Sequence, residues 1–207
     1  MGDEDVDEDM SDEEIDEYVQ EKYSEWFEFH ENFDQSMFFK EGIQEITLDD
    51  TVSEFLSAAP IMSKWTAATC RLYVAPNIPK KKLRNGISND RYKAEGLLKE
   101  DNVWAMVDER TALFSPKYGL MVTNIGIFWN STEWGKGGMP WRINDSRITT
   151  FWMNPDAFLL GELGVVIDDE ITIPIGTLGP INKGEMAALI TWLAFLPQIA
   201  NEQHSRI

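Results

Sequence analysis

Residues 102–130 read NVWAMVDERTALFSPKYGLMVTNIGIFWN, and the pattern in this stretch decides the fold that we expect. Its apolar residues fall into runs separated by turn-forming residues, which predicts consecutive antiparallel strands. Thr123 and Asn124 followed by Gly126 predict a tight hairpin between the segments GLMVT and GIFW, because Asn and Gly adopt turn conformations at little cost. We expect Trp129, in the second segment, to lie in the core.

The segments around this stretch extend the series of strands. The segments WTAATCRLYV, RITTFWM, FLLGELGVVI and EITIPI each predict a strand, at residues 65–74, 147–153, 158–167 and 170–175. Asp168 and Asp169 predict the turn between the last two. The glycine-rich segment NSTEWGKGGMP, residues 130–140, does not have the spacing of a P-loop, and we expect a flexible connection there.

Apolar spacing and capping residues predict three helices after residue 34. The first has Asp49 or Asp50 as its N-cap. The second lies in IPKKKLRNGI, residues 78–87, with a proline in its first turn. The third is capped by Asn182 and is apolar nearly all round, so we expect it to plug an open barrel and to end at Pro197.

A run of strands closed by a terminal helix predicts an α+β fold, here an antiparallel barrel of six or seven strands with an N-terminal helical extension. The 207 residues suffice for one such domain and an appendage. The expected parts are a disordered acidic tail, a helical extension, the barrel domain and a polar C-terminal tail, at residues 1–11, 12–77, 78–197 and 198–207.

The net charge of −18 is concentrated at the N-terminus. Residues 1–34 hold 16 Asp and Glu against the single Lys22, a net charge of −15, and the remainder carries −3. Such a block is typical of a solvated tail, and it also fits a nucleic-acid mimic that docks on a basic partner. The balance argues against direct nucleic-acid binding through a broad basic face.

Residues 12–33 predict a helix with an aromatic stripe, because large apolar side chains recur at spacings of three and four. The opposite face of this helix is mostly glutamate. The stripe packs either on the core of the same chain or on a partner, and the sequence leaves both interpretations open.

The cysteine and histidine content excludes several classes of site. A single cysteine, Cys70, cannot form an internal disulfide and is typical of a reducing compartment, so we expect a cytoplasmic protein. His30 lacks the second histidine of a zinc-binding HExxH motif, and we expect no metal or cofactor. The apolar run at residues 186–196 is too short to span a bilayer, and we expect no membrane binding.

Two groups of residues are candidates for contact with a partner. Lys80, Lys81, Lys82 and Arg84 form the only dense basic cluster, which is either an exposed helix face or a contact for an anion or a partner. Trp134 and Trp141 stand at the margins of the glycine-rich segment. Aromatic side chains of this kind are frequent at interfaces.

Residues 78 to about 197 resemble the bacterial pleckstrin-homology-like (PH-like) domains of uncharacterised cytosolic proteins. The resemblance rests on the IPKKK helix and on one long motif, whose matching positions are Asp108, Thr111, Phe114 displaced by one, Ser115, Gly119, Thr123, Gly126 and Trp129. It implies a PH-like barrel that binds or assembles and does not catalyse. The loop around Asp108, Glu109 and Arg110 lacks the basic residues that phosphoinositide binding requires.

We therefore expect a non-enzymatic interaction or assembly module of bacterial or phage type, which binds a protein partner or a second copy through the barrel. One alternative is an acidic decoy, in which residues 1–34 imitate nucleic acid on a basic partner surface. Another is a hydrolase of unrecognised type. No serine, cysteine or histidine stands in a motif that predicts a nucleophile with its base, and we assign no catalytic residue.

Overall fold

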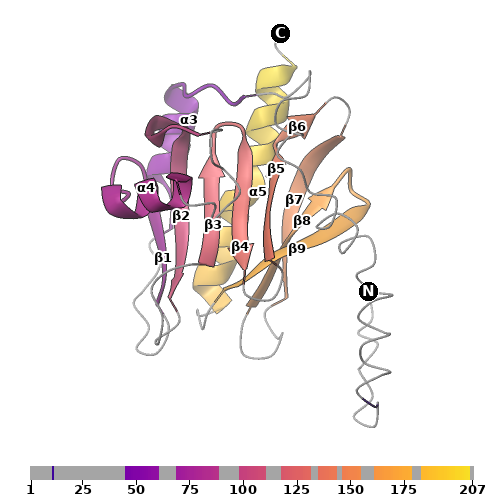
Figure 1. Cartoon of the computed structure of the whole chain (residues 1–207). Coiled ribbons are helices and arrows are strands. Elements are labelled where there is room, and N and C mark those ends of the chain that lie inside the picture. The colour runs from indigo at the N-terminus through magenta and orange to yellow at the C-terminus, as the bar shows by residue number, and fades with distance from the viewer. Residues whose placement is uncertain are drawn as a thin grey trace.

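The computed structural model describes Ser11 and residues 45–60, 69–88, 98–110, 118–131, 135–143, 146–154, 161–178 and 183–205. These residues form two antiparallel sheets together with helices, so the predicted α+β class is confirmed (Figure 1). The helices are α3 (Asp50–Ser57), α4 (Lys80–Ser88), the short 3₁₀ helix η2 (Glu100–Asn102) and α5 (Lys183–His204).

The first sheet has five strands in chain order: β1 (Thr69–Val74), β2 (Val103–Arg110), β3 (Tyr118–Thr123), β4 (Gly126–Ser131) and β5 (Gly135–Pro140). The predicted hairpin joins β3 and β4, where Leu120 pairs with Trp129 and Val122 with Ile127. The hydroxyl oxygen of Thr123 accepts a hydrogen bond from the backbone N–H of Gly126 at 3.1 Å and so closes the turn.

The second sheet has four strands, again in chain order: β6 (Arg142–Ile143), β7 (Ser146–Asn154), β8 (Gly161–Ile167) and β9 (Ile171–Leu178). The predicted turn between β8 and β9 is present, with positive φ at Asp168 and Asp169. The Asp168 carboxylate accepts a hydrogen bond from the backbone N–H of Arg147 at 3.0 Å. Asp168 therefore ties the predicted turn to β7.

Two apolar clusters lie on opposite faces of the first sheet. Leu120, Ile127 and Trp129 point to the larger core, which they share with the second sheet, α3 and α5. Met121 and Phe128 point to the other face, where α4 packs. The alternation along β3 and β4 follows from the period of two residues in a strand. Trp129 is fully buried, which confirms its predicted place in the core.

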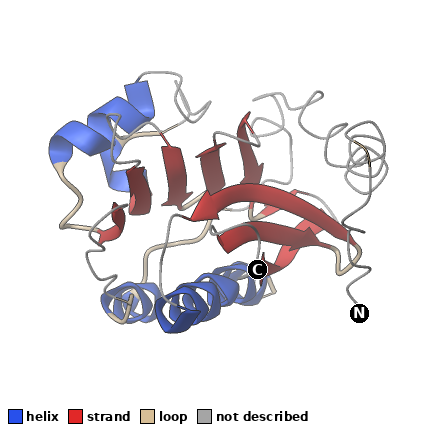
Figure 2. Cartoon of the chain, turned by 90° about the horizontal axis from the view of Figure 1, so that it is seen from below, coloured by secondary structure: helices blue, strands red, loops and turns tan. Residues whose placement is uncertain are grey.

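The helices lie in two layers. Figure 2 shows α3 and α5 side by side on one side of the first sheet and α4 on the other. Asp49 caps α3 by accepting a hydrogen bond from the backbone N–H of Val52 at 2.9 Å, as the sequence predicted. α5 packs on β7 and buries Leu189, Leu193 and Leu196.

The glycine-rich segment is a strand, so the prediction of a flexible connection is wrong for residues 135–140. Its glycines allow aromatic rings of β4 to lie directly on the β5 backbone. A Cβ atom on Gly137 would lie 2.8 Å from Nε1 of Trp129, and one on Gly138 would lie 2.7 Å from Cδ1 of Phe128. The absence of side chains thus serves close packing. The described residues contain nine strands, more than the six or seven predicted.

Two boundaries that the sequence predicts, at residues 78 and 197, do not separate parts of the structure. α5 continues beyond Pro197 to His204, because Leu196 and Ala200 are both buried and their packing offsets the hydrogen bond that proline cannot make. β1, placed in the N-terminal extension by the sequence, is the first strand of the five-stranded sheet. Val52 and Leu56 of α3 belong to the same core as α5.

Candidate interaction site

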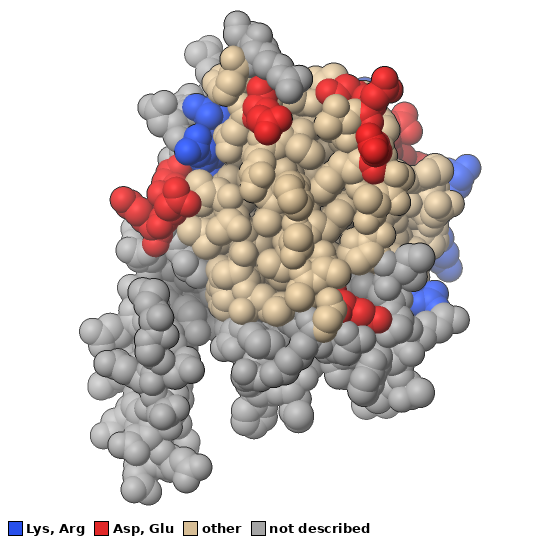
Figure 3. Space-filling view, turned by 180° about the vertical axis from the view of Figure 1, so that it is seen from behind, with Lys and Arg blue, Asp and Glu red and all other residues tan. Residues whose placement is uncertain are grey.

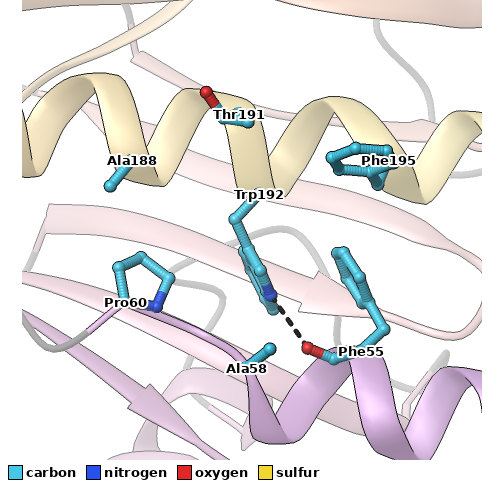
Figure 4. Close-up of a pocket in the computed structure, with 7 residues that line it drawn as sticks. All are labelled: Phe55, Ala58, Pro60, Ala188, Thr191, Trp192 and Phe195. Atoms are coloured by element: carbon cyan, nitrogen blue, oxygen red, sulfur yellow. Dashed lines mark hydrogen bonds between the residues drawn. The ribbon is translucent and has the colours of Figure 1, made fainter.

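The described residues hold no cluster of three or more potential metal ligands. None of the helices described is both long and apolar enough to cross a bilayer. The surface instead carries an apolar pocket between α3 and α5, with a volume of about 470 Å³. We call it the α3–α5 pocket, and its lining residues are Phe55, Ala58, Pro60, Ala188, Thr191, Trp192 and Phe195 (Figure 4).

Three aromatic side chains form the wall of the α3–α5 pocket. The rings of Phe55 and Trp192 stack with centroids 5.1 Å apart and 6° between their planes. Phe195 meets Phe55 edge to face, at 6.2 Å and 63°. The indole N–H of Trp192 donates to the carbonyl oxygen of Phe55 at 3.2 Å, as the dashed line in Figure 4 shows. This bond satisfies the only polar atom of the indole, so an apolar surface remains toward the pocket.

A second set of contacts fixes α5 against the segment that precedes α3. The Gln203 side chain accepts a hydrogen bond from the backbone N–H of Thr47 at 2.7 Å and donates one to the Thr47 carbonyl at 3.0 Å. It also donates to the carboxylate of Asp49 at 3.3 Å. Because α3 and α5 are held at two places, the pocket between them exists without a ligand.

The α3–α5 pocket lies on a face with few charges at its centre. Phe195 is 48% exposed and Leu48, just before α3, is 56% exposed, both high values for large apolar side chains. Figure 3 shows this face as a broad area without acidic or basic side chains, with acidic and basic groups at its edge. Exposed apolar surface of this kind, rimmed by polar groups, marks interaction sites.

The charges on the elements around the pocket are mostly negative. α3 and its N-cap carry Asp49, Asp50 and Glu54, and α5 carries Glu185 and Glu202 against one lysine, Lys183. A partner with basic residues beside its apolar contact is therefore favoured electrostatically.

The two tryptophans proposed from the sequence are not in this site. Trp141 is fully buried, and its indole N–H donates to the Thr123 carbonyl at 2.9 Å. Its side chain presents no surface to a partner, so the expectation of a surface contact is corrected: Trp141 is a core residue that anchors the β3–β4 turn. Trp134 lies outside the described residues.

Two residues of the basic cluster form ion pairs with acidic residues of the same chain, and the other two are exposed lysines. Lys82 pairs with Asp108 of β2, a carboxylate that is 6% exposed. Arg84 donates to Glu100 at 2.8 Å, and this hydrogen bond raises the pKa of the Arg84 guanidinium above its ordinary value. Lys80 and Lys81 are exposed. All four stand on α4, on the opposite side of the first sheet from the α3–α5 pocket (Figure 2).

The pocket residues were not predicted as a site. Trp192 and Phe195 belong to the helix that the sequence predicts to be apolar nearly all round, and no site was assigned to it. The signal available in the sequence was the excess of apolar residues in α5, since a helix against one side of a core can bury only part of its circumference.

Comparison with known proteins adds no relative. No protein-family model matches the chain, and no curated protein or solved structure shows significant similarity to it.

Proposed function

We propose that this chain is a non-enzymatic protein-interaction module, in which the α3–α5 pocket receives apolar side chains from a partner. The observation that carries the proposal is a preformed pocket of about 470 Å³ lined by Phe55, Trp192 and Phe195, of which Phe195 is 48% exposed. Aromatic residues at the centre of such a surface commonly supply most of the binding energy.

The layout supports a PH-like fold as part of this proposal. Two antiparallel sheets follow each other in chain order, and a C-terminal helix packs against β7 of the second sheet. β9 contacts β3 and β4, which brings the two sheets together as in a closed or partly open barrel. A fold of this type hosts many functions, so the function is argued from the pocket and not from the fold.

The partner that fits this site is an amphipathic helix with basic residues beside its apolar face. A groove between two helices accepts apolar anchors at positions i, i+3 or i+4 and i+7 of a third helix. The acidic residues of α3 and α5 attract Lys and Arg next to those anchors. They repel the segment 1–34, with its charge of −15, and the same acidic residues on a second copy.

The test is a random 16-residue peptide library displayed on phage and panned on the full chain. We expect enriched peptides with apolar residues at helical spacing and flanking Lys or Arg. Synthetic copies should bind the Phe195→Asp variant at least about tenfold more weakly, since apolar area is replaced by charge. The matched control is Gln198→Asp, which adds the same charge at an exposed position of α5 outside the pocket lining.

Two results would contradict the proposal. One is an equal loss of peptide affinity in Phe195→Asp and Gln198→Asp. The added charge, and not the lost apolar contact, would then explain the weaker binding. The other is a library from which no peptide that depends on Phe195 is enriched. Phe195 is half exposed, so both variants should melt close to the parent temperature, and thermal unfolding verifies this.

A further inference from the structure

β1 is an edge strand of the first sheet, and it offers backbone groups that no other described residue uses. β1 pairs with β2 along its whole length, from Thr69 opposite Arg110 to Val74 opposite Ala105. Within the described part of the chain, no strand pairs with its other edge. An edge of this kind is a template for one more strand.

The register identifies the groups that point outward. The backbone N–H of Ala75 donates to the Trp104 carbonyl at 2.8 Å, so residue 75 points toward β2. The direction of the backbone N–H and C=O groups alternates along an antiparallel strand. The backbone groups of Tyr73 therefore also point toward β2, while those of Leu72 and Val74 point to the free edge. The Val74 carbonyl confirms this direction, since it accepts from the N–H of Asn77 in the turn beyond the strand, at 2.8 Å.

A cleft of about 430 Å³ runs along this same edge. One wall is β1 and the turn after it, residues 72–77, and the other wall is the end of α3 with Leu56, Ala59 and Pro60. Pro60 also lines the α3–α5 pocket, so the cleft and the pocket adjoin. The cleft therefore brings outward backbone donors and acceptors next to apolar side chains.

We infer that this edge binds an extended polypeptide segment, which adds to the sheet as a strand beside β1. The N–H and C=O of Leu72 and the N–H of Val74 would bond to the backbone of the added segment. This binding mode is independent of the α3–α5 pocket: it uses backbone hydrogen bonds, whereas the pocket uses aromatic side chains.

The walls of the cleft define the chemistry of the added segment. Leu72 and Val74 pack toward the larger core, and Tyr73 packs toward the face of α4. Side chains of an added strand alternate in the same way, so every second one would meet Leu56, Ala59 and Pro60 and should be apolar. The remaining side chains of the added strand would lie on the opposite face, where Lys82 lies over the ring of Tyr73. These side chains should be polar.

A segment of another protein fits this edge better than a second copy of the chain. Two copies that paired through β1 would bring together molecules that each carry a net charge of −18, and this repulsion opposes their association. We therefore assign the edge to a partner segment with alternating apolar and polar residues.

The experiment first selects peptides that bind the full chain from a random 12-residue phage-displayed library. The selected peptides are then synthesised, and NMR follows the exchange of the chain's amide hydrogens with and without each peptide. We expect exchange at Leu72 and Val74 to slow at least about tenfold on binding. The amides of Arg71 and Tyr73 already bond to β2 and serve as internal controls that should change little.

A pair of variants tests the backbone donor directly. Leu72→Pro removes the outward N–H without breaking a bond to β2, and proline is tolerated at edges whose N–H faces away from the sheet. Leu72→Ala loses similar packing and keeps the N–H. We expect Leu72→Pro to weaken peptide binding at least about tenfold and Leu72→Ala to weaken it about threefold or less.

Several outcomes would overturn the inference. These are unchanged exchange at Leu72 and Val74 in the peptide complexes, equal affinity of the two variants, or a library that yields no peptide bound at this edge. Protection of the same two amides in the free protein, together with a dimer in sedimentation equilibrium, would assign the edge to a second copy. The exchange measurement uses the parent chain, so it remains decisive if Leu72→Pro does not fold.

Discussion

Lys82 of α4 and Asp108 of β2, which are 26 positions apart, form an ion pair that fastens the basic helix to the first sheet. The side chain of Lys82 is 17% exposed and that of Asp108 is 6% exposed. Lys82 also lies over the ring of Tyr73, 5.5 Å from its centroid. One lysine of the basic cluster is therefore a structural contact.

This relationship predicts a large loss of stability for Lys82→Met. The substitution keeps an unbranched side chain over Tyr73 but leaves the buried Asp108 carboxylate without the charge of Lys82, which should cost about 3 kcal/mol. Arg84→Met is the matched control on the same helix, because the Arg84–Glu100 pair is solvent-exposed. Urea unfolding of both variants provides the measurement.

Arg84→Met should leave the free energy of unfolding unchanged within error. Similar and small losses in both variants would show that water solvates Asp108 when Lys82 is absent. In that case α4 would be held by its apolar contacts alone, such as those of Leu83.

A second prediction concerns the indole of Trp141. Trp141→Phe keeps a large ring but removes the donor to the buried Thr123 carbonyl, and we expect a cost of about 1–3 kcal/mol. Trp192→Phe removes a comparable indole N–H, which donates to the Phe55 carbonyl oxygen. This bond is only partly buried, so water can replace the donor. The loss in Trp192→Phe should therefore be smaller, and thermal or chemical unfolding of both variants decides the order.

Local patterns predicted the parts of the fold that depend on near neighbours. The β3–β4 hairpin, the Asp49 cap of α3 and the Asp168-Asp169 turn each follow from residues within a few positions of one another. β5 was missed because Gly137 and Gly138 read as flexible when they are considered alone. Their role depends on the rings of Trp129 and Phe128 in the neighbouring strand.

The α3–α5 pocket was not predictable for a related reason. Trp192 donates to Phe55 across 137 positions of sequence, and no spacing rule connects the two. The sequence showed that α5 is too apolar for one buried face, but which face remains exposed is set by the position of α3. The partners of Lys82 and Arg84 were likewise fixed by tertiary contacts.

A third prediction separates two reasons for glycine. A Cβ atom on Gly126 would lie 2.7 Å from the Cα of Pro140 and still closer to the carbonyl of Met139, so Gly126→Ala should cost about 3 kcal/mol. Gly135 has φ +69 and nothing within 4 Å of its Cβ position. Asparagine adopts such a conformation readily, so Gly135→Asn should be nearly neutral. Unfolding measurements compare the two variants. A loss of stability in Gly126→Ala as small as that in Gly135→Asn would mean that β5 can shift away from β4.

The last prediction distinguishes the pocket from the acidic N-terminal segment as the source of binding. If partners are held by the aromatic wall of the α3–α5 pocket, deletion of residues 1–11 should change the affinity of the selected 16-residue peptides by about twofold or less. The acidic residues of α3 and α5 remain in that variant, so the modest dependence on salt should also remain. An oligolysine peptide of the same length is the matched control for pure charge.

An acidic decoy would give the opposite results. Charges exposed in solvent are screened over about 8–10 Å at physiological salt, so affinity would fall steeply between low and physiological salt. Deletion of residues 1–11 removes six acids and would reduce that slope, and oligolysine would bind as well as the selected peptides. Isothermal titration of both peptides against the full and shortened chains at several salt concentrations makes the comparison. We expect a shallow slope that survives the deletion, because the binding energy comes from apolar contact with Phe55, Trp192 and Phe195.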